Sequence, residues 1–172
     1  MSGETWGEGR EGIGWGKNVS YEDRLKELGL SLPAPPKPVA NYVPVVRTGD
    51  LLFLSGILPL RDGRLVLTGK LGENLTVEQG VEAARVAVLN GLSIVRSETG
   101  SLDRVKQIVK MVGYVASAPG FTDQPQVLNG ASDLLVSVFG EAGRHARVAV
   151  GAAELPRLAS IEIELIVEVR SP

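Results

Sequence analysis

The sequence predicts an α+β domain of two layers, in which one mixed β-sheet is covered on one face by two helices. Two segments, 76–99 and 123–139, carry apolar residues at steps of three and four, the spacing of one helical face. The segments between and after them alternate in polarity or are rich in β-branched residues, as strands are. Two helices with one apolar face each can cover one side of a single sheet, which is an α+β arrangement.

The first predicted element is a short helix followed by a stiff connector. Ser20 is in the position of an N-cap, and Asp23 stands where a capping box would have Glu or Gln. Gly29 is placed to end the helix. Four prolines in the segment "LPAPPKP", 32–38, then predict an extended, polyproline-like spacer.

A β-hairpin is expected next. Its strands are predicted at 42–47 and 51–55, and the segment Thr48-Gly49-Asp50 has the composition of the turn between them. A second turn at Asp62-Gly63 precedes a predicted short strand at 64–68.

The first long helix has clear start and stop signals. Thr76 and Gln79 form the S/T-x-x-E/Q pattern of a capping box, and Gly100 stands where the helix should end. The β-branched segment 105–116 that follows is predicted to be a long central strand.

The second helix should start near Asp123, with Gln126 completing a D-x-x-Q variant of the capping box, and should stop at Gly140. Two alternating strands, 144–151 and 161–169, complete the chain. Both helices would lie on one face of the sheet, so the other face would be uncovered. Since that face carries apolar residues, association with further copies is the simplest way to cover it.

Three regions are expected along the chain. Residues 1–18 form a glycine-rich N-terminal arm that carries Trp6 and Trp15. This arm is interpreted either as a flexible leader or as a segment whose tryptophans dock on a partner subunit. Residues 19–39 contain the short helix and the proline-rich connector, and residues 40–172 form the main domain.

Composition excludes several classes of site. The 172 residues include no cysteine, which excludes disulfides, thiolate nucleophiles and thiolate metal sites. The net charge is −2 and no run of lysine and arginine occurs, which argues against a nucleic-acid partner. No apolar stretch reaches the roughly 18 residues that a membrane span needs. With no signal peptide visible, we expect a cytoplasmic protein with no membrane partner.

Arg147 and Glu162 are the strongest candidates for chemistry. Arg147 shares one face of its strand with Ala149 and Gly151, and small neighbours leave room beside a guanidinium that could hold a carboxylate. Glu162 opens the next strand, and a nearby carboxylate can move a proton. The alternative for Arg147 is a structural salt bridge, for example with Glu162. The alternative for Glu162 is a solvated acidic face, since it shares its strand face with further glutamates.

The chain resembles the RidA/YjgF family, also labelled L-PSP or perchloric-acid-soluble proteins. The resemblance covers about 40–169 and includes an asparagine-bearing helix; the segments before it resemble a branch with an N-terminal helix and a proline-rich connector. Singly these pieces are weak, but their order and spacing are specific: "LSGILP" (54–59), "ARVAV" (146–150), "LP" (155–156) and "IEIE" (161–164).

The resemblance implies a chorismate-mutase-like fold and a homotrimer with a central barrel of sheets and the helices outside. It implies clefts between subunits, where enamine or imine intermediates are hydrolysed to 2-oxo acids and ammonia without cofactor or metal. It assigns catalytic roles to Arg147, which would hold the substrate carboxylate, and to Glu162, which would position water. It also implies a set of substrate-binding residues: Tyr42, Ser55, Gly56, Asn129 and Ala149.

Three departures from the family pattern bear on activity. Ala149 stands where the family usually has cysteine, Gly151 where a glutamate is common, and Ile57 where glutamine is usual, which would make that corner of the pocket more apolar. These changes favour a second hypothesis, a non-catalytic trimer that binds small carboxylate metabolites. A third hypothesis, a ribonuclease, is disfavoured by the charge of the chain.

Other polar residues have simpler interpretations. Ser55 is more often a residue of a strand end than a nucleophile, and no histidine–acid pair accompanies it. His145 is the only histidine, so a histidine-rich metal site is not expected, although its place two residues before Arg147 allows contact with the site.

Overall fold

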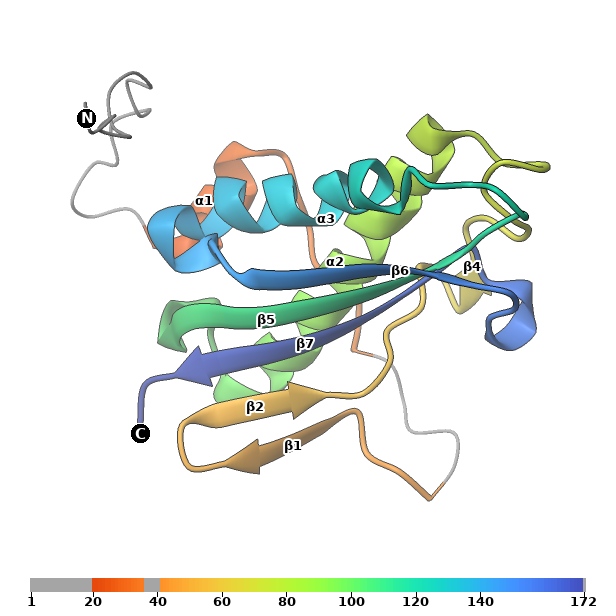
Figure 1. Ribbon diagram of the computed structural model, residues 1–172. Coiled ribbons are helices and arrows are strands. Elements are labelled where there is room, and N and C mark those ends of the chain that lie inside the picture. The colour runs from red at the N-terminus through yellow and green to blue at the C-terminus, as the bar shows by residue number, and fades with distance from the viewer. Residues whose placement is uncertain (1–19, 36–40, 172) are drawn as a thin grey trace, which may run out of the picture.

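The computed structural model describes residues 20–35 and 41–171, and the tryptophan-bearing arm and the end of the proline-rich connector lie outside these residues. The main sheet has five strands in the order β1-β2-β7-β5-β6. All neighbours are antiparallel except β5 and β6, which are parallel, so the sheet is mixed as predicted. Figure 1 shows this sheet with β1 at one edge and β6 at the other.

The helices and strands follow the predicted order. Within the described residues, short 3-10 turns lie between α2 and β5 at 102–104, between α3 and β6 at 140–143, and between β6 and β7 at 156–158. The bounds are α1 Tyr21–Glu27, β1 Val45–Thr48, β2 Leu51–Leu54, β3 Leu60–Arg61, β4 Arg64–Leu65, α2 Val77–Thr99, β5 Val105–Ala116, α3 Gln124–Phe139, β6 Ala146–Ala152 and β7 Ile161–Val169.

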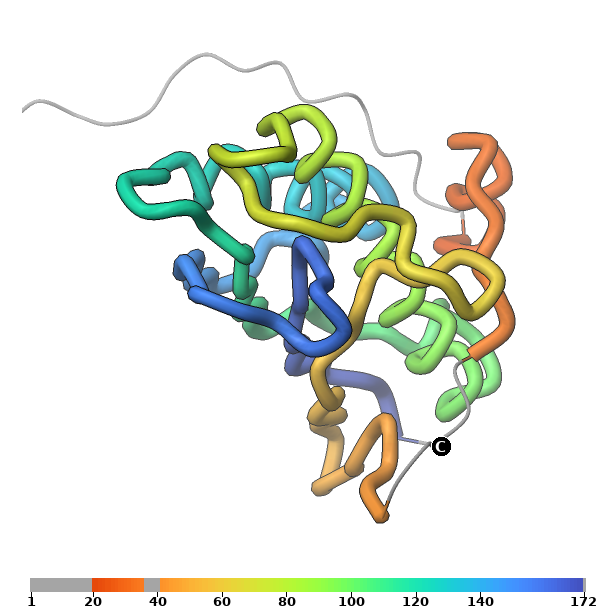
Figure 2. The backbone as a smooth tube through the Cα atoms, turned by 90° about the vertical axis from the view of Figure 1, so that its right-hand side faces the viewer, coloured from red at the N-terminus to blue at the C-terminus, as the bar shows by residue number. Residues whose placement is uncertain are grey.

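Helices α2 and α3 cover one face of the sheet, and the core lies between the two layers. Figure 1 shows α2 behind the sheet, and in Figure 2, turned by 90°, the β1–β2 hairpin forms the lower end of the molecule. The apolar stripes of both helices are buried against alternate residues of β5 and β7. The two helices pack closely at Gly130, where an added Cβ would lie 2.3 Å from the carbonyl oxygen of Val81.

Most of the predicted helix signals are confirmed. In α2, the hydroxyl of Thr76 accepts from the N–H of Gln79, the side chain of Gln79 accepts in return from the N–H of Thr76, and Gly100 ends the helix with φ 83°. Ser20 caps α1 by accepting from the N–H of Asp23. At Gly29, φ is 67°, which suits glycine at a helix end.

Three local predictions needed correction. The D-x-x-Q box of α3 is wrong, because Asp123 makes no side-chain capping bond. The first strand of the hairpin is shorter than predicted, with β1 beginning only after Pro44, a residue that cannot donate to a ladder. The strand expected at 64–68 pairs only through Arg64–Leu65 with β3, in a separate two-stranded sheet.

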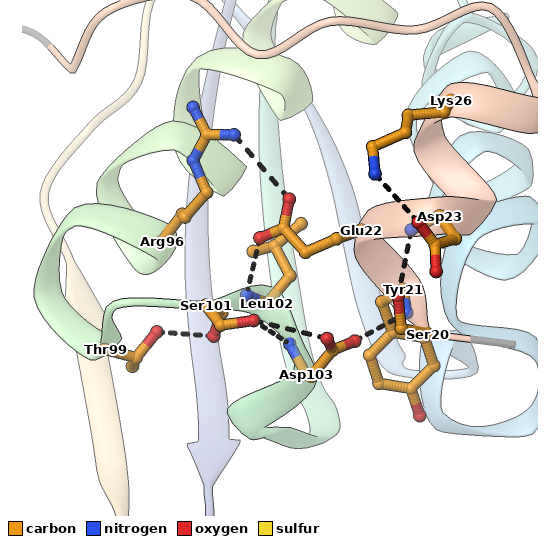
Figure 3. A network of polar contacts seen from close by, with 10 residues as sticks. All are labelled: Ser20, Tyr21, Glu22, Asp23, Lys26, Arg96, Thr99, Ser101, Leu102 and Asp103. Atoms are coloured by element: carbon orange, nitrogen blue, oxygen red, sulfur yellow. Dashed lines mark hydrogen bonds and ion pairs between the residues drawn. The ribbon is translucent and has the colours of Figure 1, made fainter. Parts of the chain in front are cut away.

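Helix α1 is fastened to the domain by a reciprocal pair of carboxylates, shown in Figure 3. The carboxylate of Glu22 accepts from the N–H of Leu102 at 3.0 Å and lies 3.6 Å from the guanidinium of Arg96. In return, the carboxylate of Asp103 accepts from the N–H of Tyr21 at 2.6 Å. These contacts hold α1 against the helix layer, so the short N-terminal helix is part of the folded domain.

We expect Glu22→Ala to lower the free energy of unfolding by about 1–2 kcal/mol, because the N–H of Leu102 loses its acceptor and the guanidinium of Arg96 loses its ion-pair partner. Chemical denaturation measures this change. The control is Lys26→Ala, which removes an exposed ion pair with Asp23 and should cost less than about 0.5 kcal/mol. If the two variants lose the same free energy of unfolding, the Glu22 contacts contribute no more to stability than an exposed ion pair does.

The face of the sheet opposite the helices is partly apolar and uncovered in a single chain. Phe53 pairs with Val46 on β1 and with Ile166 on β7, so these three side chains share that face. Val148 and Val150 of β6 lie on it as well and are 41% and 38% exposed. This uncovered face fits the prediction that further copies of the chain would cover it. Among the described residues, no helix has the length and apolar character of a membrane span.

Candidate active site

Arg147 lies on edge strand β6 and points toward the helix layer. It pairs in register with the buried Met111 of β5, so its side chain is on the side of α3. Its Nη1 donates to Oδ1 of Asn129 at 2.9 Å and to Oγ of Ser132 at 3.1 Å. Asn129 lies off the apolar stripe of α3, and this is why its side chain is free to hold the arginine.

The guanidinium of Arg147 keeps one edge for a ligand. Both of its protein partners are neutral and both bind Nη1, and within the described residues no carboxylate forms an ion pair with it. The alternative of a structural salt bridge with Glu162 is therefore wrong for the single chain. A guanidinium with an open edge suits bidentate binding of a carboxylate.

Ser132 and His145 belong to the same cluster, and sequence reasoning had not selected Ser132. The Oγ of Ser132 lies 3.2 Å from Nε2 of His145, and Nδ1 of His145 lies 2.6 Å from the carbonyl oxygen of Gly143. The signal for Ser132 was its i, i+3 spacing from Asn129, which puts both on one helix face. We call Arg147, Asn129, Ser132 and His145 the arginine cluster.

The arginine cluster opens onto a surface groove. Burial lowers the pKa of the His145 imidazole, and the charge of Arg147 lowers it further, although the contact with Gly143 opposes both effects. The lowered pKa favours the neutral imidazole at pH 7. The groove runs along α3 and the start of β6, and its lining consists of Ser132, Asp133, Val136, Ser137, Arg144, His145 and Arg147.

Glu162 lies elsewhere, at the start of β7 on the uncovered face of the sheet. Its side chain lies over Gly56, where an added Cβ would be 1.9 Å from the carboxylate oxygen, so a larger residue at 56 would displace the glutamate. The neighbouring Ser55 donates from Oγ to the carbonyl oxygen of Val43 at 2.7 Å, which pins the segment that carries Tyr42. Tyr42 is 54% exposed. We call Glu162, Gly56 and Ser55 the glutamate cluster.

The hydroxyl of Ser55 has a structural use, as the simpler interpretation predicted. The carboxylate of Glu162 is half-buried, and burial raises its pKa, with a smaller contribution from the negative charge of Glu164. A carboxyl group with a raised pKa is better matched to proton transfer near neutral pH than an ordinary one.

The raised pKa of Glu162 predicts a pH-dependent stability. The folded state binds this proton more tightly than the unfolded state, so stability falls as pH rises from the ordinary carboxyl value of 4.5 through the raised pKa. We expect Glu162→Gln to raise the free energy of unfolding at pH 7 by roughly 0.5–1 kcal/mol, a small gain because the side chain is only half-buried.

Denaturation at pH 4 and at pH 7 measures this effect. The gain from Glu162→Gln should be present at pH 7 and smaller at pH 4, where the wild-type carboxyl is protonated. Glu141→Gln removes an exposed carboxylate on the surface and serves as the control. A loss of stability at pH 7, or a gain that is larger at pH 4, would contradict a raised pKa at Glu162.

The two clusters lie on opposite faces of the sheet in one chain. Glu162 pairs in register with Tyr114 of β5, whereas Arg147 pairs with Met111, and these two residues of β5 are of opposite parity along the strand. Strand β5 also separates β6 from β7. A site that uses both Arg147 and Glu162 therefore needs two copies of the chain, each supplying one cluster.

The three departures from the family pattern have different surroundings. Ala149 and Gly151 follow Arg147 on the helix side of β6, and an added Cβ at Gly151 would lie 2.9 Å from Nε2 of Gln124. Ile57 is only 4% exposed and packs under α2 beside Gly91. The prediction that Ile57 makes a pocket corner more apolar is therefore wrong, since its side chain is in the core. The described residues also contain no acidic or histidine cluster that could hold a metal ion.

Comparison with known families gives one clear match. The family model described as "YjgF/chorismate mutase-like, putative endoribonuclease" matches residues 22–169. The protein TCP17 of Trypanosoma cruzi is 49% identical over 148 residues, which are 86% of this chain and 92% of the relative.

Two further comparisons bear on fold and chemistry. The crystal structure of Atu1372, a protein of unknown function from Agrobacterium tumefaciens, has a TM-score of 0.82 at 45% identity and covers 87% of this chain and 92% of that one. The 2-iminobutanoate/2-iminopropanoate deaminase of Dermatophagoides farinae is 27% identical over 143 residues, 80% of this chain and 93% of the relative.

Proposed function

Since the chain belongs to the YjgF/chorismate mutase-like family, we propose that it hydrolyses small 2-imino acids to 2-oxo acids and ammonia at a site shared between copies of the chain. The family match confirms the resemblance seen in the sequence and the chorismate-mutase-like fold. The observation that carries the proposal is the guanidinium of Arg147, which two neutral partners hold while one edge stays open beside a groove.

Arg147 binds the carboxylate of the substrate in this proposal. The open edge of the guanidinium gives two parallel N–H donors, which match the two oxygens of a carboxylate. Asn129 and Ser132 both accept hydrogen bonds from Nη1, and these two bonds limit the rotation of the arginine side chain. Binding of the carboxylate fixes the position of the imine carbon relative to Glu162 and the attacking water. For an intrinsically reactive substrate, such positioning supplies much of the rate enhancement.

Glu162 handles the proton transfers. A water molecule attacks the carbon of the C=N bond while the carboxylate of Glu162 accepts its proton. The carboxyl group then returns that proton to nitrogen, which gives a carbinolamine. In a second transfer Glu162 moves the remaining hydroxyl proton to nitrogen, the C–N bond breaks, and ammonia leaves as the carbon becomes the carbonyl of a 2-oxo acid. The raised pKa of Glu162 suits a group that must both accept and donate near neutral pH.

A homotrimer would bring the two clusters together. In this arrangement the uncovered sheet faces of three chains line a central barrel and the helices lie outside, so that Val148, Val150 and Phe53 leave water. The arginine cluster of one chain then meets the glutamate cluster of the next. The deaminase of Dermatophagoides farinae supports the choice of imines as the substrate class.

A second candidate function is a non-catalytic trimer that binds small carboxylates. Ala149 and Gly151 favour it, because both replace side chains usual in the family and lie on the same strand face as Arg147. The open edge of Arg147 serves this function equally well. A ribonuclease, the activity in the family description, is not favoured by a net charge of −2.

Turnover of a freshly made imine separates the two candidates. A threonine dehydratase generates 2-iminobutanoate in solution, and the rate of 2-oxobutanoate formation is followed with and without this protein. Acceleration supports the deaminase. Binding of 2-oxobutanoate, measured by calorimetry without any acceleration, would replace the deaminase with the carboxylate binder.

A further inference from the structure

We propose that Ser132 and His145 are positioning residues for Arg147: a hydrogen-bonded relay from Gly143 through His145 and Ser132 fixes the direction in which the guanidinium presents its open edge. The inference deepens the proposed function and rests on it, because it assigns the relay to the carboxylate-binding step. Both residues line the same groove as Arg147, and the inference assigns them their effect on the substrate through Arg147.

The relay begins with the tautomer of His145. Nδ1 lies 2.6 Å from the carbonyl oxygen of Gly143, and a carbonyl oxygen can only accept, so the proton is on Nδ1. In the neutral imidazole the other nitrogen, Nε2, is then an acceptor. The nearest donor to Nε2 is the hydroxyl of Ser132, at 3.2 Å.

Ser132 passes this orientation on to Arg147. The hydroxyl of Ser132 has one hydrogen and donates it in a hydrogen bond to Nε2 of His145. A lone pair of the oxygen therefore faces Arg147 and accepts a hydrogen bond from Nη1 at 3.1 Å. If His145 did not accept that hydrogen, the hydroxyl could rotate and present it toward the cation. The neutral state of His145 is therefore part of the geometry that holds the arginine.

The hydroxyl of Ser132 is used differently from those of Ser137 and Thr99. Ser137, on the same helix, donates to the carbonyl oxygen of Asp133 four residues earlier, and Thr99 on α2 does the same to Val95. This local bond is the common choice for Ser and Thr inside helices. Ser132 makes no such bond and is directed out of its helix toward His145 and Arg147, as a residue with a tertiary role would be.

The test compares Ser132→Ala with Ser132→Thr in the imine assay. We expect Ser132→Ala to raise KM for 2-iminobutanoate about 10-fold with kcat changed less than about 3-fold, because the loss is in carboxylate binding. Ser132→Thr keeps the hydroxyl and should stay within about 3-fold of wild type in KM. Thr99→Ala, which removes a helical hydroxyl outside the groove, is the control and should leave both constants unchanged.

A double-variant cycle separates positioning from general structure. If Ser132 acts through Arg147, Ser132→Ala should have no further effect once Arg147→Ala is present. His145→Leu removes the acceptor and should raise KM in the wild-type background as Ser132→Ala does, so the inference does not depend on one variant. A loss that persists in the Arg147→Ala background, or an unchanged KM in Ser132→Ala, would overturn the relay.

Nuclear magnetic resonance gives a readout that needs no turnover. His145 is the only histidine of the chain, so its imidazole ¹⁵N signals need no assignment. We expect the Nδ1–H tautomer in wild type at pH 7, and a shift of both signals on addition of 2-oxobutanoate that disappears in Arg147→Ala. The Nε2–H tautomer would overturn the relay. If Arg147→Ala binds 2-oxobutanoate as tightly as wild type does, the proposed carboxylate site itself is wrong. If Arg147→Ala loses this binding but Ser132→Ala binds normally, only the relay is wrong and the carboxylate site stands.

Discussion

Arg147→Ala should lower kcat/KM for the hydrolysis of 2-iminobutanoate by about 100-fold or more. In the proposed function this change removes two charge-assisted hydrogen bonds to the substrate carboxylate, each worth about 1.5–3 kcal/mol, from the guanidinium that Asn129 and Ser132 hold. The rate of 2-oxobutanoate formation after in situ generation of the imine measures it, with ammonia release as a second signal.

Arg144→Ala is the matched control for this experiment. Arg144 lines the same groove, but it is exposed and its nearest charged partner is Glu141 on the surface. Its removal changes the charge of the groove by the same amount as Arg147→Ala. If the two variants lose activity equally, the arginines act only through the electrostatic potential of the groove and Arg147 does not bind a carboxylate directly.

The second large effect is recovery of activity when two inactive variants share an assembly. Arg147→Ala and Glu162→Gln should each be nearly inactive alone. Chains of both variants, unfolded and refolded together in equal amounts, should regain about a quarter of the wild-type activity, because about a quarter of the interfaces in a cyclic assembly then join an intact Arg147 to an intact Glu162.

The physical reason is the position of the two residues on opposite faces of one sheet. If a single chain could form the whole site, every chain in the mixture would lack one of the two groups and no activity would return. Mixing the two folded variants without unfolding them is the control for activity that comes from contamination. Size-exclusion chromatography with light scattering determines whether the refolded chains have reached the trimer that we propose.

Part of the candidate site was predictable from the sequence, Arg147 from the pattern of its strand and Asn129 from the family resemblance. The asparagine on α3 and the arginine on β6 were selected as separate residues, and they do contact each other, since Oδ1 of Asn129 accepts from Arg147. For His145 the sequence predicted only that its place two residues before Arg147 allows contact with the site. Its observed contacts are with the carbonyl oxygen of Gly143 and with Ser132, and a sequence pattern does not contain the path of the backbone at that turn.

What the sequence determined by itself was local. Thr76 with Gln79 begins α2, Gly100 ends it, and the alternation along β7 divides that strand into a core face and an outer face, because capping and the two-residue period of a strand depend only on neighbours in the chain. Only the tertiary structure decided that Glu162 on β7 and Arg147 on β6 lie on opposite faces of the sheet. The relative parity of two strands follows from their registers with β5, and a shift of one residue would have put both groups on one face.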